Sequence, residues 1–285
     1  MAAIHLTTKR VEKPWGRRDL WPGFVDVPAG GAPVGEVWFE VPGKKDGDAG
    51  GPDLLIKYLF TSDKLSVQVH PTDEEARARG YPRGKDEAWV ILDADPHASI
   101  ALGTKKVISR ETLRKSAEDG TIEELLDWKA VKQNDSFYTP AGTIHAIGPG
   151  ITLIEVQQNV DLTYRLYDYG SARTLHLDDG IAVAEPVPYV APYKAHAIAP
   201  GRSILADGPA FVLERWTKPG SAALQCDGRP LWLVPIAGKG TLDGGPLEAG
   251  GAWMVHSAVP LALDDGIDLL VAYPGSGVIA DLWQG

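Results

Sequence analysis

Residues 64–71 read KLSVQVHP, and apolar and polar side chains alternate along this octapeptide. A β-strand has a side-chain period of two, so we expect the leucine and the valines on one face and the serine, glutamine and histidine on the other. Gln68 and His70 would then lie about 7 Å apart with parallel side chains, which suits two ligands of one metal ion. The alternative is an ordinary half-buried strand with incidental polar residues, and the stretch alone leaves both interpretations open.

The composition of the 285 residues favours a turn-rich β protein. Hydrophobic residues make up 44% and charged residues 23% of the chain, which is enough for one large or two smaller domains. The 32 glycines and 22 prolines fit many turns between short strands. A net charge of −10 argues against nucleic acid or an anionic membrane as a partner. An anionic ligand would therefore need a local cluster of basic residues.

Cysteine usage and the N-terminal sequence predict a cytoplasmic protein. Cys226 is the only cysteine, so no intrachain disulfide can form, which is compatible with a reducing cytosol. Residues 1–20 mix charges throughout and have no apolar core, so we expect no signal peptide. No apolar run is long enough to span a bilayer.

Short predicted strands divide the chain into two β domains. We predict a first domain over residues 1–190, with a small helical insertion at about 109–128, and a second β-barrel over residues 191–285. Ser109 is a candidate N-cap for the first helix of the insertion, and Thr121 begins a candidate capping box for the second. The second domain has no matching set of glutamine, histidine and glutamate. We therefore expect it to lack a metal site and to have a structural or rim-forming role.

Three other segments carry polar residues with two possible interpretations each. Lys57 interrupts the apolar run 54–60, so it either reaches a sheet edge or points into a polar cavity. Glu87 shares a strand face with Trp89 and is either an edge charge or a ligand. His145 follows a Pro/Gly turn and is either a structural residue or a ligand that the rigid turn orients.

Together, four side chains form a candidate metal shell: Gln68, His70, Glu87 and His145. Two histidines and a carboxylate suit a catalytic zinc ion, to which Gln68 could add a carbonyl oxygen. Only one ligand is anionic, so a bound divalent ion would keep a net positive charge and act as a strong Lewis acid. Mixed nitrogen and oxygen ligation also fits manganese, iron or cobalt. The chain has no GxGxxG, Walker A or GxSxG motif.

Four blocks of sequence resemble the type I mannose-6-phosphate isomerases, and in particular the short bacterial branch of this cupin family. The blocks occur in the family's order within residues 13–170: LSVQVHP at 65–71, GKDE at 84–87, PAGTIH at 140–145, and residues 157–170 with YRLYDY at 164–169. The second half of the chain matches in general character only. The resemblance implies an all-β fold of two cupin (jelly-roll β-barrel) domains with the small helical insertion.

The resemblance also implies a zinc enzyme, with one ion per chain, that interconverts mannose 6-phosphate and fructose 6-phosphate. It assigns the metal to the four ligands named above. It implies roles in the sugar-phosphate pocket for Ser66, Lys57, Lys85 and Arg165, and an acid/base role for Asp161.

Two departures from the family pattern bear on catalysis. Gly84 lies where long-branch members have a histidine, so a proton-shuttling histidine is absent there. Residues 159–161 read NVD in place of the usual Ser-Asp pattern, although the aspartate four positions before Arg165 is retained.

Aldose–ketose isomerisation fits these residues. The reaction moves a proton from one carbon to its neighbour through an enediolate, whose negative charge needs an electrophile placed beforehand. The metal and Arg165 could supply that electrophile. The base is either Asp161 or Lys85, and the sequence does not choose between them. Lys57, Lys85 and Arg165 are the candidates for binding the phosphate.

Two other functional classes stay open at this point. One is a cupin oxygenase with iron in the same ligands, and the basic trio of Lys57, Lys85 and Arg165 argues against it. The other is a catalytically silent sugar-binding or regulatory cupin, against which the intact ligands beside the basic residues argue. The expected partner is a small sugar phosphate, and both a monomer and a homodimer are open.

Overall fold

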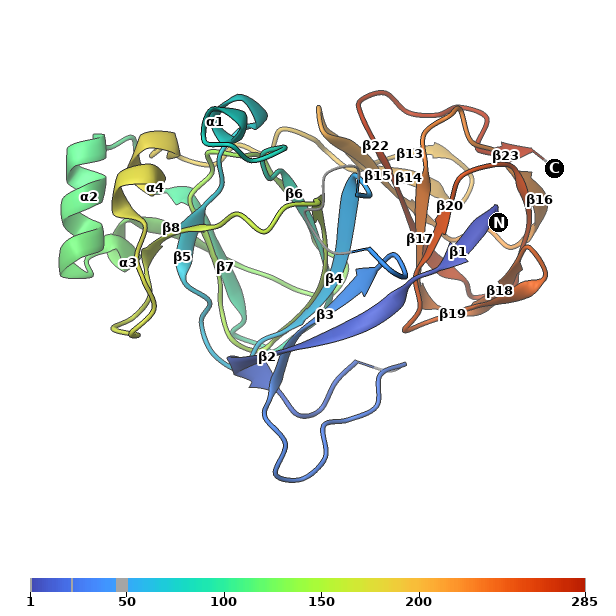
Figure 1. The fold of residues 1–285 in the computed structure, drawn as a ribbon, viewed down its shortest axis with the longest axis horizontal. Coiled ribbons are helices and arrows are strands. Elements are labelled where there is room, and N and C mark those ends of the chain that lie inside the picture. Colours follow the sequence, from blue (N-terminus) through green and yellow to red (C-terminus); the bar gives the residue numbers. More distant parts are fainter. Residues whose placement is uncertain (1, 22, 45–50, 285) are drawn as a thin grey trace.

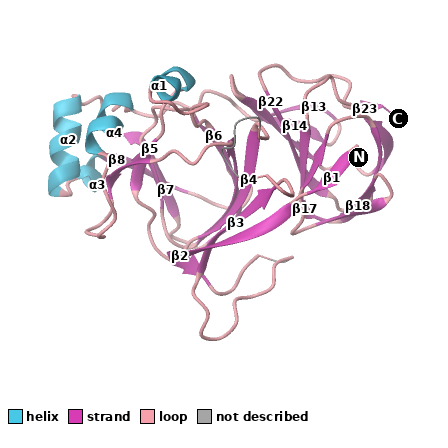
Figure 2. Ribbon diagram, in the orientation of Figure 1, coloured by secondary structure: helices cyan, strands magenta, loops and turns pink. Residues whose placement is uncertain are grey.

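The computed structural model describes residues 2–21, 23–44 and 51–284 (Figure 1). The described residues form many β-strands and four α-helices, which confirms the all-β class. The strands make four sheets, arranged as two pairs, and the helices gather at the end of the molecule away from the two chain ends (Figures 1 and 2). Within each sheet the strand order is linear, so these are open sheets rather than closed barrels.

The first pair of sheets forms an antiparallel sandwich from the first half of the chain. One sheet has the order β2 (Thr7–Arg17), β3 (Val34–Glu40), β4 (Leu54–Phe60), β11 (Ile151–Gln158), β6 (Glu87–Ala94), β9 (Ser136–Thr139). The other has the order β12 (Tyr164–Tyr167), β5 (Val67–Val69), β10 (His145–Ile147), β7 (Ser99–Thr104), β8 (Leu126–Ala130). Side chains from both sheets meet in one buried cluster, so the sheets pack face to face.

Alternation along the six-stranded sheet separates two environments. On β4, Ile56, Tyr58 and Phe60 point to an outer apolar core, whereas Lys57 points into the sandwich. On β11, Glu155 lies opposite Lys57 in the strand register. The inner face therefore carries charged groups on a sheet whose outer face is apolar.

The second pair of sheets comes mainly from the last third of the chain. One sheet has the order β1 (Ala3–His5), β20 (Trp253–Val255), β17 (Leu231–Ala237), β22 (Asp268–Pro274), β15 (Phe211–Trp216), β14 (Arg202–Asp207), β13 (His196–Ala199). The other has the order β19 (Gly245–Glu248), β18 (Lys239–Leu242), β21 (Val259–Leu263), β16 (Gly220–Leu224), β23 (Trp283–Gln284). The N-terminal strand β1 thus belongs to the sheet built from C-terminal strands.

One apolar core joins the two sandwiches. It combines the outer face of the six-stranded sheet, including Tyr58 and Val90, with residues of the seven-stranded sheet, including Phe211, Leu213 and Trp232. A separate cluster lies under the helices, against the five-stranded sheet that holds β5 and β10. The helices are α1 (Asp73–Ala78), α2 (Arg110–Asp119), α3 (Ile122–Leu125) and α4 (Leu177–Val183).

The structure corrects two local predictions. The strand expected over 64–71 is only the three residues of β5, and Leu65 packs inside the sandwich instead of sharing the face of Val67 and Val69. Ser109 caps α2 through its side chain as predicted. Thr121, however, forms no capping box, because its hydroxyl donates to Asp119 at 2.6 Å.

Two further predictions concern the chain as a whole. No helix among the described residues is long and apolar enough to cross a membrane. The division into domains at residue 190 stays a prediction.

Candidate metal centre and adjoining pocket

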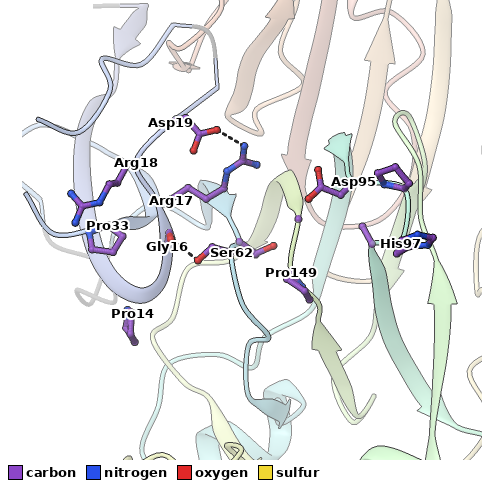
Figure 3. Close-up of a pocket in the computed structure, with 14 residues that line it drawn as sticks. Pro14, Gly16, Arg17, Arg18, Asp19, Pro33, Ser62, Asp95, His97 and Pro149 are labelled. Carbon is purple, nitrogen blue, oxygen red and sulfur yellow. Dashed lines mark hydrogen bonds and ion pairs between the residues drawn. The ribbon is translucent and has the colours of Figure 1, made fainter. Parts of the chain in front are cut away.

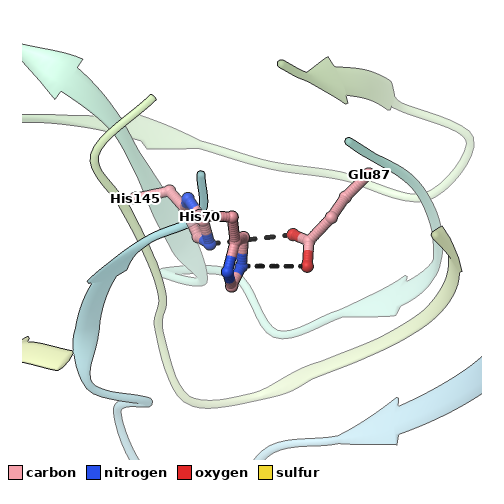
Figure 4. Close-up of side chains that lie close together, drawn as sticks. All are labelled: His70, Glu87 and His145. Atoms are coloured by element: carbon pink, nitrogen blue, oxygen red, sulfur yellow. Dashed lines mark ion pairs between the residues drawn. The ribbon is translucent and has the colours of Figure 1, made fainter. Parts of the chain in front are cut away.

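Three buried side chains converge in the interior of the first sandwich (Figure 4). His70 Nε2 lies 3.1 Å from Glu87 Oε1, and His145 Nε2 lies 3.6 Å from Glu87 Oε2. One ligand atom from each residue lies within 4.8 Å of the others. The two imidazole rings are 4.9 Å apart. This is the geometry of a group that can hold one metal ion.

A different strand end places each of the three side chains. His70 directly follows β5, Glu87 opens β6 and His145 opens β10. His145 pairs with Gln68 in the register of β10 and β5. The turn before β10 is tied to the same spot, because the Gly142 N–H donates to the His70 carbonyl at 2.8 Å. Gly142 has a φ of +86°, a conformation that favours glycine.

The hydrogen bonds of the two histidines fit them for a metal. His70 Nδ1 donates to the Leu162 carbonyl and His145 Nδ1 to the Thr143 carbonyl, each at 2.9 Å. Each imidazole therefore turns the lone pair of its Nε2 toward Glu87. Among the described residues no hydrogen-bond donor reaches the buried Glu87 Oε2. A buried carboxylate oxygen without a donor beside two imidazole lone pairs is what a cation would satisfy.

The charge states also fit a metal. Burial, together with the nearby Lys85 ammonium, lowers the pKa of His70 to about 3. Burial likewise lowers the pKa of His145. Burial acts to raise the pKa of Glu87, but the Lys85 ammonium outweighs it and holds that pKa well below its usual range. Neutral imidazoles and an ionised carboxylate are the forms that bind metals.

Gln68 and Lys85 complete the surroundings of the cluster. Gln68 Nε2 lies 3.2 Å from His145 Nε2, and a half-turn of the amide would present its oxygen there instead. The buried Lys85 Nζ bonds Glu87 Oε1 and lies 3.3 Å from His70 Nε2. The structure thus brings together all four predicted ligands and one predicted catalytic residue. Their roles stay predictions.

Gln68 and Lys85 also line a pocket of about 130 Å³. The remaining predicted residues, Ser66, Lys57, Asp161 and Arg165, line this same pocket. Six further charged or aromatic residues of its wall were not predicted from the sequence: Lys13, Trp15, Glu36, Trp38, Glu155 and Arg173.

Ion pairs organise one wall of the pocket. Lys57 Nζ lies 3.3 Å from Glu155 Oε1 and 4.6 Å from the ring centre of Trp38. Lys13 Nζ lies 3.2 Å from Glu36 Oε1. Burial acts to lower the pKa of Lys57, but the two carboxylates outweigh it and raise that pKa. The sequence signal that could have identified these residues is the alternation of side chains along a strand, because each of them occupies an inward position of β2, β3, β4 or β11.

Two arginines form another part of the wall. The Arg165 guanidinium donates to the Thr174 carbonyl at 2.9 Å, and among the described residues it has no carboxylate partner. Arg173 donates to both carboxylate oxygens of Asp168, at 2.7 and 2.5 Å. Arg173 lies in a loop, where the sequence offers no periodic signal.

A larger cavity of about 850 Å³ lies elsewhere (Figure 3). Its walls include Arg17, Arg18 and His97, and Arg17 is paired with Asp19 at 2.7 Å. None of the predicted site residues lines this cavity. The larger cavity therefore does not coincide with the candidate site.

Comparison with known proteins gives a consistent result, although no family model matches the chain. The mannose-6-phosphate isomerase ManA of Bacillus subtilis (strain 168) is 38% identical over 205 residues, which are 67% of this chain and 64% of that protein. The putative mannose-6-phosphate isomerase YvyI of the same strain is 32% identical over 222 residues, 73% of this chain and 70% of that protein. The match therefore spans 64% to 70% of the length of these relatives.

A crystal structure of the mannose 6-phosphate isomerase from Bacillus subtilis has a TM-score of 0.80 to this chain at 27% identity. That match covers 95% of this chain and 99% of the other. Fold and buried ligand cluster together define a cupin with a candidate metal centre. The identities to the curated relatives go further: the chain belongs to the mannose-6-phosphate isomerase family. The resemblance seen in the sequence is confirmed.

Proposed function

We propose that this protein is an aldose–ketose isomerase that interconverts mannose 6-phosphate and fructose 6-phosphate with one bound zinc ion. The observation that carries the proposal is the buried cluster of two histidines and a glutamate beside a pocket with several cationic residues. The proposed ligands are His70, Glu87 and His145, with Gln68 as a fourth. The substrate class follows from the names of the relatives.

A zinc ion held there would supply a Lewis acid for the oxygens of the sugar. Hydrogen bonds within the chain already orient the proposed ligands for such an ion. Two backbone carbonyls hold the imidazoles in the tautomer that presents Nε2. Lys85 forms an ion pair with Glu87 and lines the pocket, where it would stabilise the enediolate.

Arg165 is the proposed anchor for the phosphate. Its guanidinium lines the pocket and its hydrogen bond is to a neutral carbonyl, so its charge stays available for an anion. Lys57 is held by Glu155 and supports the opposite wall. Arg173, fixed by Asp168, adds a second guanidinium on the side of Arg165.

Asp161 is the proposed base. It lines the pocket, and it is exposed enough to meet a sugar carbon. Lys85 is the weaker of the two candidates, because its ammonium is bound to a buried carboxylate and would have to leave that pair. Ser66 is buried in the pocket wall and is proposed to contact the substrate.

A coupled assay on several sugar phosphates tests this function. We expect turnover of mannose 6-phosphate, loss of turnover after chelation, and recovery with added Zn²⁺. Oxygen consumption by an iron-loaded protein without isomerisation would contradict the proposal. Cytoplasmic location and the choice between monomer and homodimer stay predictions.

Substitution of a ligand tests the metal centre itself. His145→Ala is expected to lower zinc affinity by 100-fold or more and to abolish turnover, because it removes one of three convergent ligands (roughly 10- to 100-fold is usual even for indirect partners). His97→Ala, which changes an exposed histidine, is the control. Stoichiometric zinc at unchanged affinity in His145→Ala would exclude His145 from the shell.

A further inference from the structure

Asp86 lies between Lys85 and Glu87 and faces away from the pocket. Its carboxylate is buried, and its two oxygens serve two partners. Oδ1 accepts the Ala141 N–H at 2.8 Å, and Oδ2 accepts the hydroxyl of Tyr138 at 2.5 Å. The backbone at Asp86 is fixed as well, because its N–H donates to Gln158 Oε1 at 3.0 Å.

These contacts join the segments that carry the three proposed ligands. The Asp86 carboxylate ties the start of β6, and so Glu87, to the turn at Ala141. The next residue of that turn, Gly142, bonds the backbone of His70. The same turn leads into His145. A continuous series of contacts that begins at this carboxylate thus connects all three segments.

Tyr138 connects this carboxylate to the seven-stranded sheet. Its ring packs against Phe211 at 5.4 Å and stands edge-on to Tyr193 at 5.0 Å. The turn between β14 and β15 approaches its hydroxyl so closely that a Cβ added at Gly208 would lie 2.3 Å from the oxygen. Pro209 from that turn lines a cavity of about 330 Å³ together with Asp86.

We propose that Asp86 and Tyr138 are positioning residues through which the seven-stranded sheet sets the geometry of the metal centre. The inference rests on the proposed metal centre and gives the second sandwich a role in it. The Tyr138 hydroxyl donates to one oxygen of the Asp86 carboxylate, and the other oxygen accepts the Ala141 N–H of the turn that leads into His145. Loss of the hydroxyl leaves the buried oxygen without its donor, so the carboxylate shifts and the turn moves with it.

Tyr138→Phe is the main test, because it keeps the ring packing and removes only the hydroxyl. We expect Zn²⁺ affinity, measured by competition with a chromophoric chelator, to fall by about 10-fold or more. The visible spectrum of the Co²⁺-loaded chain is expected to change, since its bands report ligand geometry. Both measurements are made without substrate, so they stand whether or not the chain is an isomerase.

The control is Tyr189→Phe, which also removes a partly buried hydroxyl next to Tyr138. Tyr189 donates to the Tyr138 carbonyl at 2.6 Å and does not contact Asp86. This variant is expected to lose a similar amount of stability and to keep Zn²⁺ affinity and the Co²⁺ spectrum. Equal loss of affinity in both variants would mean that general stability is responsible and would overturn the proposal.

Two more variants test the route. Gly208→Ala, made in the second sandwich, is expected to displace the Tyr138 hydroxyl and to reproduce the Co²⁺ spectrum of Tyr138→Phe. Adding Tyr138→Phe to Asp86→Asn is expected to lower Zn²⁺ affinity less than it does in the wild type, because the two residues act as one unit. Wild-type affinity in Tyr138→Phe, or full additivity of the two changes, would overturn the proposal.

Discussion

Single residues of the pocket differ in whether their charge is already compensated. Lys13, Lys57 and Lys85 each have a carboxylate partner, whereas Arg165 has none among the described residues. Substitution of Arg165 therefore removes a charge that only a ligand would use. Arg165→Ala is expected to keep zinc and to lower kcat/KM by about 100-fold or more. Steady-state kinetics and metal analysis of the same sample check this.

Arg165→Lys separates charge from shape. A lysine keeps the charge but not the planar fork that grips a phosphate, so partial recovery is expected. Arg229→Ala, which removes an arginine paired with Asp227 in the second sandwich, is the control. Unchanged kcat/KM in Arg165→Ala would remove Arg165 from the site.

Glu36 gives the pocket wall a defined pH dependence. Burial acts to raise the pKa of Glu36, but Lys57 and Lys13 outweigh it and lower that pKa below its usual value. A carboxyl with a lowered folded pKa binds fewer protons folded than unfolded near its usual pKa of 4.5. Its contribution to stability is therefore present above pH 4.5 and is lost as the pH falls through the folded value.

Denaturant unfolding of Glu36→Gln across pH 3 to 7 tests this contribution. The wild type is expected to be more stable at pH 7, and its advantage is expected to shrink below pH 4.5. The limiting slope is about 1.4 kcal/mol per pH unit for one proton. Glu40→Gln is the control, because Glu40 lies on the same strand and pairs with the exposed Lys9. A stability difference that stays constant with pH would contradict the assignment.

Alternation singled out His70 and Glu87 as polar groups among apolar neighbours, but it left each of them with two interpretations. The structure places both in the interior of the first sandwich, and their role as ligands stays a prediction. Glu36 and Glu155 meet the same criterion, but a lone charge in a strand gives no indication of its partner. The pairing of Glu155 with Lys57 exists only through the register of β11 and β4, which the sequence does not reveal.

Among the elements, the long strands were easier to predict than the short ones. β4 has the bounds of the apolar run 54–60 identified in the sequence, because only Lys57 interrupts its apolar residues. β5 is three residues long, since Leu65 turns inward before the strand begins. α4 (Leu177–Val183) was not predicted. Its first turn carries two aspartates, but no side chain caps it, so the usual start signal is missing.

The turn before β10 is the element on which the metal centre depends most. Gly142 has a φ of +86°, and a Cβ there would lie 3.2 Å from Glu185 Cγ. Gly142→Ala is expected to strain the turn, to shift His145 and to lower zinc affinity by at least 10-fold. The measurement is zinc competition with a chelator.

Gly244→Ala is the control for that substitution. Gly244 has a φ of +77° in the turn between β18 and β19, with open space where a Cβ would go. It is expected to show a similar loss of stability, about 1 kcal/mol, with zinc affinity unchanged. If the two glycine variants bind zinc equally well, the turn does not set the position of His145.

At the scale of the whole molecule, the two sandwiches share a core instead of meeting at a polar interface. Leu213 and Trp232 from the seven-stranded sheet pack in one cluster with Tyr58 and Val90 from the six-stranded sheet. The predicted boundary at residue 190 therefore separates two segments whose side chains pack in one cluster. Removal of one sandwich would expose the apolar face of the other.

This shared core predicts that the two halves unfold together. Leu213→Ala is expected to cost roughly 2–5 kcal/mol through lost burial and a cavity. Leu213 belongs to the apolar cluster that the six-stranded and seven-stranded sheets share. Hydrogen exchange is therefore expected to accelerate in β4 and β11 as well as in β15. Leu261→Ala, in the core inside the second sandwich, should accelerate exchange there first. Exchange that stays slow in β4 and β11 of Leu213→Ala would show that the first sandwich is stable without its neighbour and would contradict joint unfolding.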